Sequence, residues 1–334
     1  MNISFFDDKP NLDELDFKIN LLKYYKNLHI DEINNLLFYG PHGSGKTTKI
    51  YALMCSIFDT KVYDLKNVFF EEDKKKIYYK SSIYHIEVDP LNLGSDEKLF
   101  IQTFLKSYVE TRNIGLNISK VILIKNANHL SKQSQMALRK IIEQNSYSSK
   151  FIFELSSITN FSLPLLSRFL HIRIKTPKYS EIKECLKNFS ERKNIIIDES
   201  KIEEIINKSD IIKNNYNLKK IFGYYRYYIL TGKDFKFIYY DKFEEIFNYI
   251  IAKKISFISL QKIRDIINEL YINLVNLNEL ITYLFDKLIY IYDNDIINKI
   301  LKIAIQTDLN IKNGNKDCLH VEYFIISVID AIHN

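Results

Sequence analysis

One eight-residue motif constrains this chain more than any other feature of its sequence. The segment "LLFYGPHGSGKTTKI" covers residues 36–50 and contains the pattern G-x-x-x-x-G-K-[ST] from Gly40 to Thr47. Four apolar residues precede the motif and an apolar-periodic segment follows it. We therefore expect a buried strand, a glycine-bearing loop and a helix that begins at Lys46. This context makes the motif specific for a phosphate-binding loop, and it predicts a nucleoside triphosphate site.

The residue types in the loop match the chemistry of phosphate binding. Gly43 and Gly45 let backbone N–H groups approach phosphate oxygens without an intervening Cβ, and the helix presents its positive end to the same anion. Lys46 would reach the β- and γ-phosphates of ATP or ADP, and Thr47 would ligate Mg²⁺. The expected nucleotide-binding residues of the loop are Gly40, Pro41, His42, Gly43, Ser44, Gly45, Lys46, Thr47 and Thr48.

The first half of the chain alternates short apolar runs with helical patterns. Alternation of this kind predicts a parallel sheet covered by helices. The expected strands are Leu36–Tyr39, Tyr84–Val88, Val121–Ile124, Phe151–Leu155 and His171–Ile174, and the expected helices between them are Lys46–Phe58, Glu97–Thr111 and Ser134–Gln144. The charged run Glu71–Lys76 reads as a solvated hairpin tip.

After Pro177 the pattern becomes helical throughout. The first three expected helices are Glu181–Arg192, Glu199–Ser209 and Leu218–Leu230. We expect three domains, namely an α/β nucleotide-binding domain (1–176), a small helical lid (177–233) and a C-terminal all-α domain (234–334).

Composition limits the function classes. The net charge of +6 permits contact with nucleic acid without demanding it. The three cysteines, Cys55, Cys185 and Cys318, lie far apart without ligand spacing, which predicts neither zinc nor a disulfide framework. We expect no signal peptide, and the sequence has no apolar stretch of about 18 residues that could span a membrane. We expect an intracellular protein without a membrane partner.

Hydrolysis of the bound nucleotide needs carboxylates at the end of a neighbouring strand. The apolar strand in "KVILIKNANHL" ends in Lys125 and Asn126, although an ammonium cannot ligate a metal and an amide is not a base. Loss of a positioned base alone costs about 10²–10⁴-fold in rate. Alternatively, Glu87 and Asp89 in "IYHIEVDP" share one side of a strand and could form the metal site. That arrangement would describe a self-sufficient P-loop ATPase such as a helicase or remodeller.

Several further segments share the order and spacing of one known family. They are "NLDELDFKINLLKYYKNL" before the loop, then "YHIEVDPLNLGSDEKLFIQTFLKS", "LSKQSQMALRKIIE", "LPLLSRF", "NLKK" and "NGNKDCLHVEYFI". Together they resemble the small subunits of replication factor C, the eukaryotic and viral-type sliding-clamp loader of the AAA+ class. The resemblance covers nearly the whole chain. Among the small subunits, the chain most resembles the one whose own ATP site is degenerate.

The resemblance implies an architecture and a set of partners. It implies an AAA+ P-loop domain, a helical lid and a C-terminal collar that holds a ring of subunits together. The chain would belong to a heteropentamer that uses ATP to load a PCNA-like sliding clamp onto primer–template DNA. Its partners would be the other AAA+ subunits, the clamp and the DNA, in the nucleus or at a cytoplasmic viral replication site.

The resemblance also assigns roles to residues. Arg168 matches the arginine finger, which acts on nucleotide bound by a neighbouring subunit, and Lys219 takes the basic sensor 2 position. The family's acidic pair falls on Lys125 and Asn126, and its sensor 1 asparagine falls on Ser156. The resemblance therefore implies a subunit that binds ATP or ADP but hydrolyses it poorly, and that contributes Arg168 in trans.

Other parts of the resemblance concern surfaces. Gln135, Arg139 and Glu143 match a family helix, where the last two lie at the subunit interface or form an i,i+4 pair. The helix that follows the second strand faces the clamp or DNA in the family. Its available cations here are Lys98, Lys106 and Arg112. The family's adenine-contacting segment, Tyr-Arg-Pro, appears here as Asp8-Lys9-Pro10.

Overall fold

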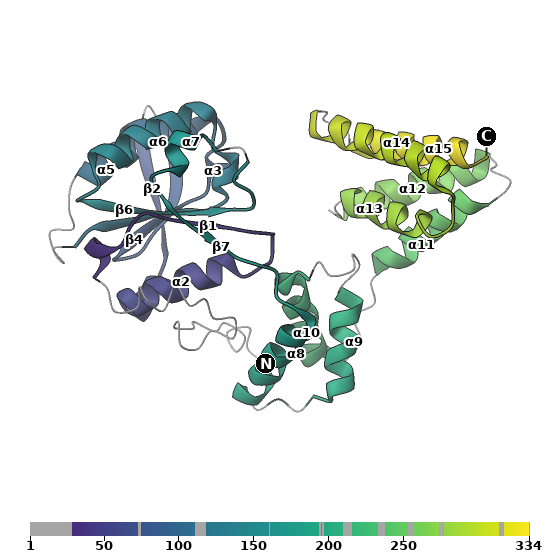
Figure 1. Ribbon diagram of the computed structural model, residues 1–334, viewed down its shortest axis with the longest axis horizontal. Coiled ribbons are helices and arrows are strands. Elements are labelled where there is room, and N and C mark those ends of the chain that lie inside the picture. Colours follow the sequence, from purple (N-terminus) through teal and green to yellow (C-terminus); the bar gives the residue numbers. More distant parts are fainter. Residues whose placement is uncertain are drawn as a thin grey trace. The chain divides into compact units, whose positions relative to one another are not determined.

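A computed structural model describes most of the chain after residue 28. The described residues are 29–72, 75–110, 118–159, 161–193, 195, 197–209, 216–232, 238–252, 257–273, 275, 277–313 and 317–333. The expected adenine segment 8–10 and the expected cation Arg112 lie outside them. The chain divides into two compact units, residues 1–210 with 214–232 and residues 211–213 with 233–334, which we describe separately (Figure 1).

A seven-stranded sheet organises the first unit. Its strand order is β2-β3-β4-β5-β6-β1-β7. The strands are β1 (Leu36–Tyr39), β2 (Lys66–Glu72), β3 (Lys75–Ser81), β4 (His85–Val88), β5 (Lys120–Ile124), β6 (Ser149–Leu155) and β7 (Leu170–Arg173). The five strands from β4 to β7 pair in parallel, as expected, whereas β2 and β3 add an antiparallel hairpin at one edge. Only the tip of that hairpin was expected, because its strands are charged and largely exposed.

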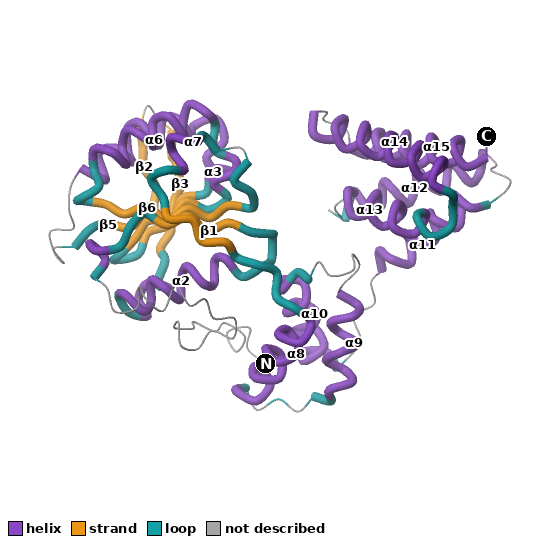
Figure 2. The backbone as a smooth tube through the Cα atoms, in the orientation of Figure 1, coloured by secondary structure: helices purple, strands orange, loops and turns teal. Residues whose placement is uncertain are grey.

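Helices cover both faces of this sheet (Figures 1 and 2). Helix α2 (Lys46–Ile57) lies on one face and packs against Phe38 and Leu123. The other face carries α6 (Lys132–Gln144), α7 (Leu163–Leu166) and a run of three helical segments. These three are α4 (Glu97–Phe100), the π-helical η6 (Ile101–Leu105) and α5 (Lys106–Glu110).

Short segments connect these elements. They are η3 (Ile30–Glu32), η4 (Thr60–Tyr63), α3 (Pro90–Leu93), η5 (Gly94–Asp96) and η7 (Ala127–His129). Because side chains alternate between faces along a strand, the parity of a strand residue decides which helix layer it meets. This rule places the polar residues of the site.

Three helices with a core of their own complete the first unit. They are α8 (Tyr179–Arg192), α9 (Glu199–Ser209) and α10 (Leu218–Thr231). Leu186, Ile206 and Tyr225 are buried in a cluster separate from those of the sheet. A domain boundary at residue 176 stays a prediction.

The second unit is entirely helical in its described residues. Its helices are α11 (Ile238–Ile251), α12 (Phe257–Ile272), α13 (Leu277–Leu288), α14 (Asn294–Asn313) and α15 (Asp317–His333). They share one apolar core, which includes Phe243, Leu284 and Phe324. Within the described ranges, no helix is both long and apolar enough to cross a membrane.

Candidate nucleotide-binding site

The phosphate loop connects β1 to α2 as the sequence predicts. Gly45 caps the helix in the left-handed region, with φ 82°, and Lys46 begins it. The Lys46 side chain is buried, and its Nζ donates hydrogen bonds to the carbonyl oxygens of Gly40 (2.9 Å) and Pro41 (2.8 Å). Burial lowers the pKa of Lys46, and the nearby carboxylate of Glu154 opposes that shift. The loop therefore holds a desolvated cation that an incoming phosphate would stabilise.

Helix α10 begins directly against this loop. The Leu218 N–H donates to the Gly43 oxygen (2.9 Å), and the Asn217 side chain caps α10 by accepting from Lys220 N (3.2 Å). A Cβ on Gly43, whose φ is 75°, would lie 2.0 Å from Asn217 Oδ1. The glycine therefore serves this close approach as well as phosphate access. Lys219 is exposed in the first turn of α10 beside this contact, whereas the role of Asn217 was not predicted.

A carboxylate that the sequence reasoning missed lies against the loop. Thr47 Oγ1 donates to Glu154, with distances of 2.9 Å to Oε1 and 3.0 Å to Oε2. Glu154 is on β6, opposite Phe38 of β1 in the parallel register. Because Phe153 and Leu155 pack on the other face of the sheet, Glu154 points to the α2 face. The available signal was a single acid within the buried strand "FIFEL".

Lys125 follows β5 and is neutralised by the strand beside it. Its Nζ forms an ion pair with Glu87 of β4, and the Tyr51 hydroxyl of α2 also donates to Glu87. Burial by itself raises the pKa of Glu87, but the hydrogen bonds from Lys125 and Tyr51 and the charge of Lys125 outweigh it, so the pKa is lowered. Glu87 is 6% exposed and stays ionised as part of a buried pair.

Asn126 and Asp89 form a second contact between the same two strands. Asn126 Nδ2 donates to Asp89 Oδ2 (2.8 Å), while Asp89 Oδ1 accepts from Leu91 N (3.1 Å) and caps α3. Each residue at the family's acidic positions thus binds one carboxylate of β4 or its end. These contacts use Glu87 and Asp89 for structure and argue against the alternative metal site.

A buried histidine adjoins the Lys125–Glu87 pair. The His85 ring meets Tyr51 edge-on at 5.9 Å between centroids, and its Nδ1 lies 2.7 Å from Ser82 Oγ. Its Nε2 is buried and has no hydrogen-bond partner. Burial lowers the pKa of His85 to about 4, with Glu87 opposing and Lys125 adding to the shift. The ring is therefore neutral at physiological pH.

The expected arginine finger is held by α6. Arg168 follows α7 and pairs with Glu143, which also accepts from Arg139 Nε (3.1 Å) in an i,i+4 pair. Gln135, on the same helix, accepts from the Ser162 N–H at the start of α7 (3.1 Å). Helix α6 therefore fixes both ends of the segment that carries Arg168.

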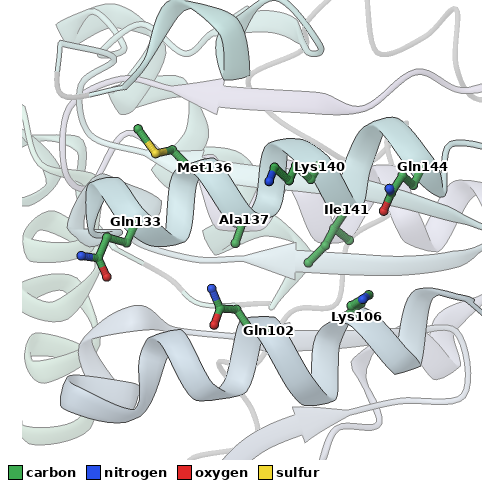
Figure 3. Close-up of a pocket in the computed structure, with 8 residues that line it drawn as sticks. All are labelled: Gln102, Lys106, Gln133, Met136, Ala137, Lys140, Ile141 and Gln144. Atoms are coloured by element: carbon green, nitrogen blue, oxygen red, sulfur yellow. The ribbon is translucent and has the colours of Figure 1, made fainter.

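The expected DNA- or clamp-facing cations are exposed where they are described. Lys98 lies on α4, whereas Lys106 lines a groove of about 440 Å³ between the η6–α5 segment and α6 (Figure 3). The groove also contains Lys140, which the sequence reasoning did not select. Its lining residues are Gln102, Lys106, Gln133, Met136, Ala137, Lys140, Ile141 and Gln144.

Three expected residues of the nucleotide site have peripheral places. His42 and Thr48 are exposed on the loop and the first turn of α2. Ser156, at the expected sensor 1 position, donates its backbone N–H to Asn128 Oδ1 (3.5 Å). That contact connects the end of β6 with the segment after β5.

Comparison with known proteins shows what this chain is similar to. No protein-family model matches the chain. It is 26% identical over 333 residues to a putative replication factor C small subunit of Acanthamoeba polyphaga mimivirus, covering 95% of this chain and 87% of that protein. It is 34% identical over 168 residues to replication factor C subunit 5 of Saccharomyces cerevisiae, covering 46% of this chain and about half, 48%, of the yeast protein.

A solved structure supports the fold. AMPPCP-bound DnaA from Aquifex aeolicus matches with a TM-score of 0.50 at 14% identity, over 98% of this chain and 99% of that one. The long viral match and the fungal match point to the same kind of protein, and the solved structure agrees with them in fold. The chain is therefore similar over most of its length to a replication factor C small subunit, and its fold is of the AAA+ type.

Proposed function

We propose that this chain acts in a clamp loader as a subunit that binds ATP or ADP with Mg²⁺ but does not hydrolyse it at a useful rate. One observation carries the proposal. The phosphate loop is complete, while the place that needs free carboxylates holds the Lys125–Glu87 pair. Binding and chemistry depend on different parts of the site, and only the first part is intact.

The residues that bind nucleotide have the required chemistry. The loop amides and Lys46 would hold the phosphates, and the Thr47 hydroxyl would face the metal ion. Both Thr47 and Glu154 offer hard oxygen atoms, which Mg²⁺ prefers. When bound, the ion supplies charge neutralisation between the phosphates.

The missing function is activation of water. A base must be ionised and within hydrogen-bond reach of the attacking water. Glu87 is ionised, but its oxygen atoms are occupied by Lys125 and Tyr51. Asn126 replaces a base with an amide. Hydrolysis at this site should therefore be slower by at least about 10²-fold than with a positioned base.

The chain would contribute to catalysis through Arg168. An arginine supplied to a neighbour's nucleotide stabilises transition-state charge by about 10³–10⁵-fold in rate. In the free chain Arg168 pairs with Glu143, which would keep the guanidinium near the surface beside α6. In the assembled ring, the neighbour's γ-phosphate would compete with Glu143 for this cation.

Two surfaces support contacts with macromolecules. The groove with Lys106 and Lys140 carries two ammonium groups among amides, a composition suited to phosphate contacts on primer–template DNA. In the second unit, exposed apolar residues follow helical spacing on α14 and α15, which favours packing against other subunits. They are Leu301, Ile305 and Leu309 on α14 and Leu319, Tyr323 and Ile326 on α15.

Native purification of the chain from its source, with mass identification of associated proteins, tests this proposal. We expect several related AAA+ chains together with a sliding clamp, from the nucleus or a viral replication site. A lone chain, or a ring of identical copies, would contradict the proposal, because a ring of such subunits contains no site able to cut ATP. ATP hydrolysis by the lone chain would instead favour a self-sufficient ATPase.

A further inference from the structure

Three charged side chains lie on the α2 face of the sheet, on neighbouring strands. Glu87 comes from β4, Lys125 follows β5 and Glu154 comes from β6. The strand order β4-β5-β6-β1 places Glu154 next to the strand that leads into the phosphate loop. The charges therefore alternate from negative to positive to negative toward the loop.

The two carboxylates differ in how they are compensated. Glu87 has the Lys125 ammonium and the Tyr51 hydroxyl as direct partners. Within the described part of the chain, Glu154 accepts hydrogen bonds from Thr47 and forms no salt bridge. Lys46 attracts it without direct contact. A half-buried carboxylate with only a hydroxyl donor is incompletely stabilised, and a cation beside it would supply what is missing.

Thr47 identifies which cation this would be. Its hydroxyl is the group that a phosphate loop offers to Mg²⁺, and both oxygen atoms of Glu154 lie within 3.0 Å of it. Magnesium takes one or two carboxylates and fills its other positions with phosphate oxygens and water. One acid is therefore enough, although the described residues contain no group of three or more potential ligands.

We infer that Glu154 is the acidic ligand of the nucleotide-bound Mg²⁺, directly or through a coordinated water. The carboxylate that the end of β5 lacks is thus supplied from β6, one strand closer to the loop. This inference rests on the proposed nucleotide binding. It also explains how the chain can hold a magnesium nucleotide without cutting it, because Glu154 contacts the Thr47 hydroxyl that would face the metal, whereas Glu87 on the same face is paired with Lys125.

Equilibrium titration of a fluorescent ADP or ATP analogue with the full-length chain tests this role. Affinity is measured in EDTA and then across a range of Mg²⁺ concentrations. For Glu154→Gln we expect the Mg²⁺ concentration at the midpoint to rise about 10- to 100-fold, as for the loss of a residue that supports a metal. Affinity in EDTA should stay equal or become tighter, because a negative charge near the phosphates is removed.

Glu87→Gln is the matched control, since it removes a carboxylate from the same face two strands away. It should leave the Mg²⁺ midpoint unchanged. Glu154→Asp, which keeps the charge on a shorter side chain, should give an intermediate midpoint and serves if the glutamine variant does not fold. Binding of Mn²⁺ in the presence of nucleotide, followed by its EPR signal, should weaken in the same order.

The possible failures are distinguishable. An unchanged midpoint in Glu154→Gln, or a shift in Glu87→Gln instead, overturns the magnesium role while nucleotide binding stands. Equal weakening with and without Mg²⁺ also overturns it, because that result means a general loss of loop structure. No nucleotide binding by the wild-type chain overturns the proposed function and this inference together.

Discussion

The polar side chains on the β1–β6 side of the sheet differ from those on the β4–β5 side in how their charges are compensated. On the β1–β6 side, the Lys46 ammonium binds carbonyl oxygens of the phosphate loop, and Thr47 donates to Glu154 beside it. On the β4–β5 side, Lys125 and Asn126 each bind a carboxylate of the neighbouring segment. The β1–β6 side is therefore suited to binding a ligand, whereas the polar groups on the β4–β5 side already bind one another.

Under the proposed function, this difference would let the site bind nucleotide without hydrolysing it. Lys125 and Asn126 each have a carboxylate partner, because Glu87 lies on β4 and Asp89 directly follows it. The parallel register between β4 and β5, with Glu87 opposite Leu123, brings these groups together. The Lys125–Glu87 pair then gives the β4–β5 side a structural role of its own.

The largest effect should come from Arg168. Because the chain's own site is proposed not to hydrolyse ATP, this arginine would be its contribution to hydrolysis. Arg168→Ala should reduce hydrolysis at the neighbouring subunit's site by about 10³-fold or more, measured as single-turnover ATP cleavage in the assembled complex. Arg139→Ala is the matched control, since Arg139 binds the same Glu143. Equal losses in both variants would mean that the helix surface, and not the finger, is responsible.

Breaking the Lys125–Glu87 pair should have the next largest effect, a loss of stability. Lys125→Met leaves Glu87 buried without its counter-ion, and such changes lower the free energy of unfolding by about 3–5 kcal/mol. The double variant Lys125→Met/Glu87→Gln should recover most of this loss. Urea unfolding of the three proteins measures it, and a double variant no more stable than the single one would refute the account of a compensated pair.

A smaller effect, on nucleotide affinity, is expected from a change on the β1–β6 side. Lys46→Ala removes a charge-assisted hydrogen bond to phosphate, worth about 1.5–3 kcal/mol, or about 10- to 150-fold in nucleotide affinity. Unlike the change at Glu154, this loss should be equal in Mg²⁺ and in EDTA. Nucleotide titration under both conditions checks it, and a loss confined to Mg²⁺ would assign Lys46 to the metal instead of the phosphates.

His85 should make stability depend on pH on the β4–β5 side, and for a change of one pH unit this effect is the smallest of the four. Its pKa is lowered to about 4 in the folded chain, whereas its ordinary value is 6.5. The unfolded chain therefore binds more protons between these values, and stability falls as the pH drops from 6.5 to 4, by at most about 1.4 kcal/mol per pH unit. His85→Phe should flatten this part of the stability curve. An unchanged slope would mean that other groups produce it.

The sequence predicted the local features of the molecule well. The five parallel strands and the loop from Gly40 to Thr47 depend on patterns within short windows, and their bounds agree with the structure within one or two residues. The edge hairpin was missed because β2 and β3 are mostly exposed and lack an apolar face long enough to give a recognisable strand pattern.

The pairs that define the site depend on strand order and register, which no short window contains. Glu154 lies 107 residues from Thr47, and Glu87 lies 38 residues from Lys125. The local signal at Glu154, a single acid within the apolar strand "FIFEL", does not identify its partner. Parity alone could have placed it on the α2 side, once β6 was known to adjoin β1.

The proposed function requires that this chain's own site binds nucleotide without cutting it. The direct test is ATP turnover by the assembled complex, with clamp and DNA, in which the loop lysines of all other subunits are changed to alanine. We expect that adding Lys46→Ala here changes nothing, because turnover is already at background. Turnover above background that Lys46→Ala removes would contradict the account and show that this site hydrolyses ATP despite Lys125 and Asn126.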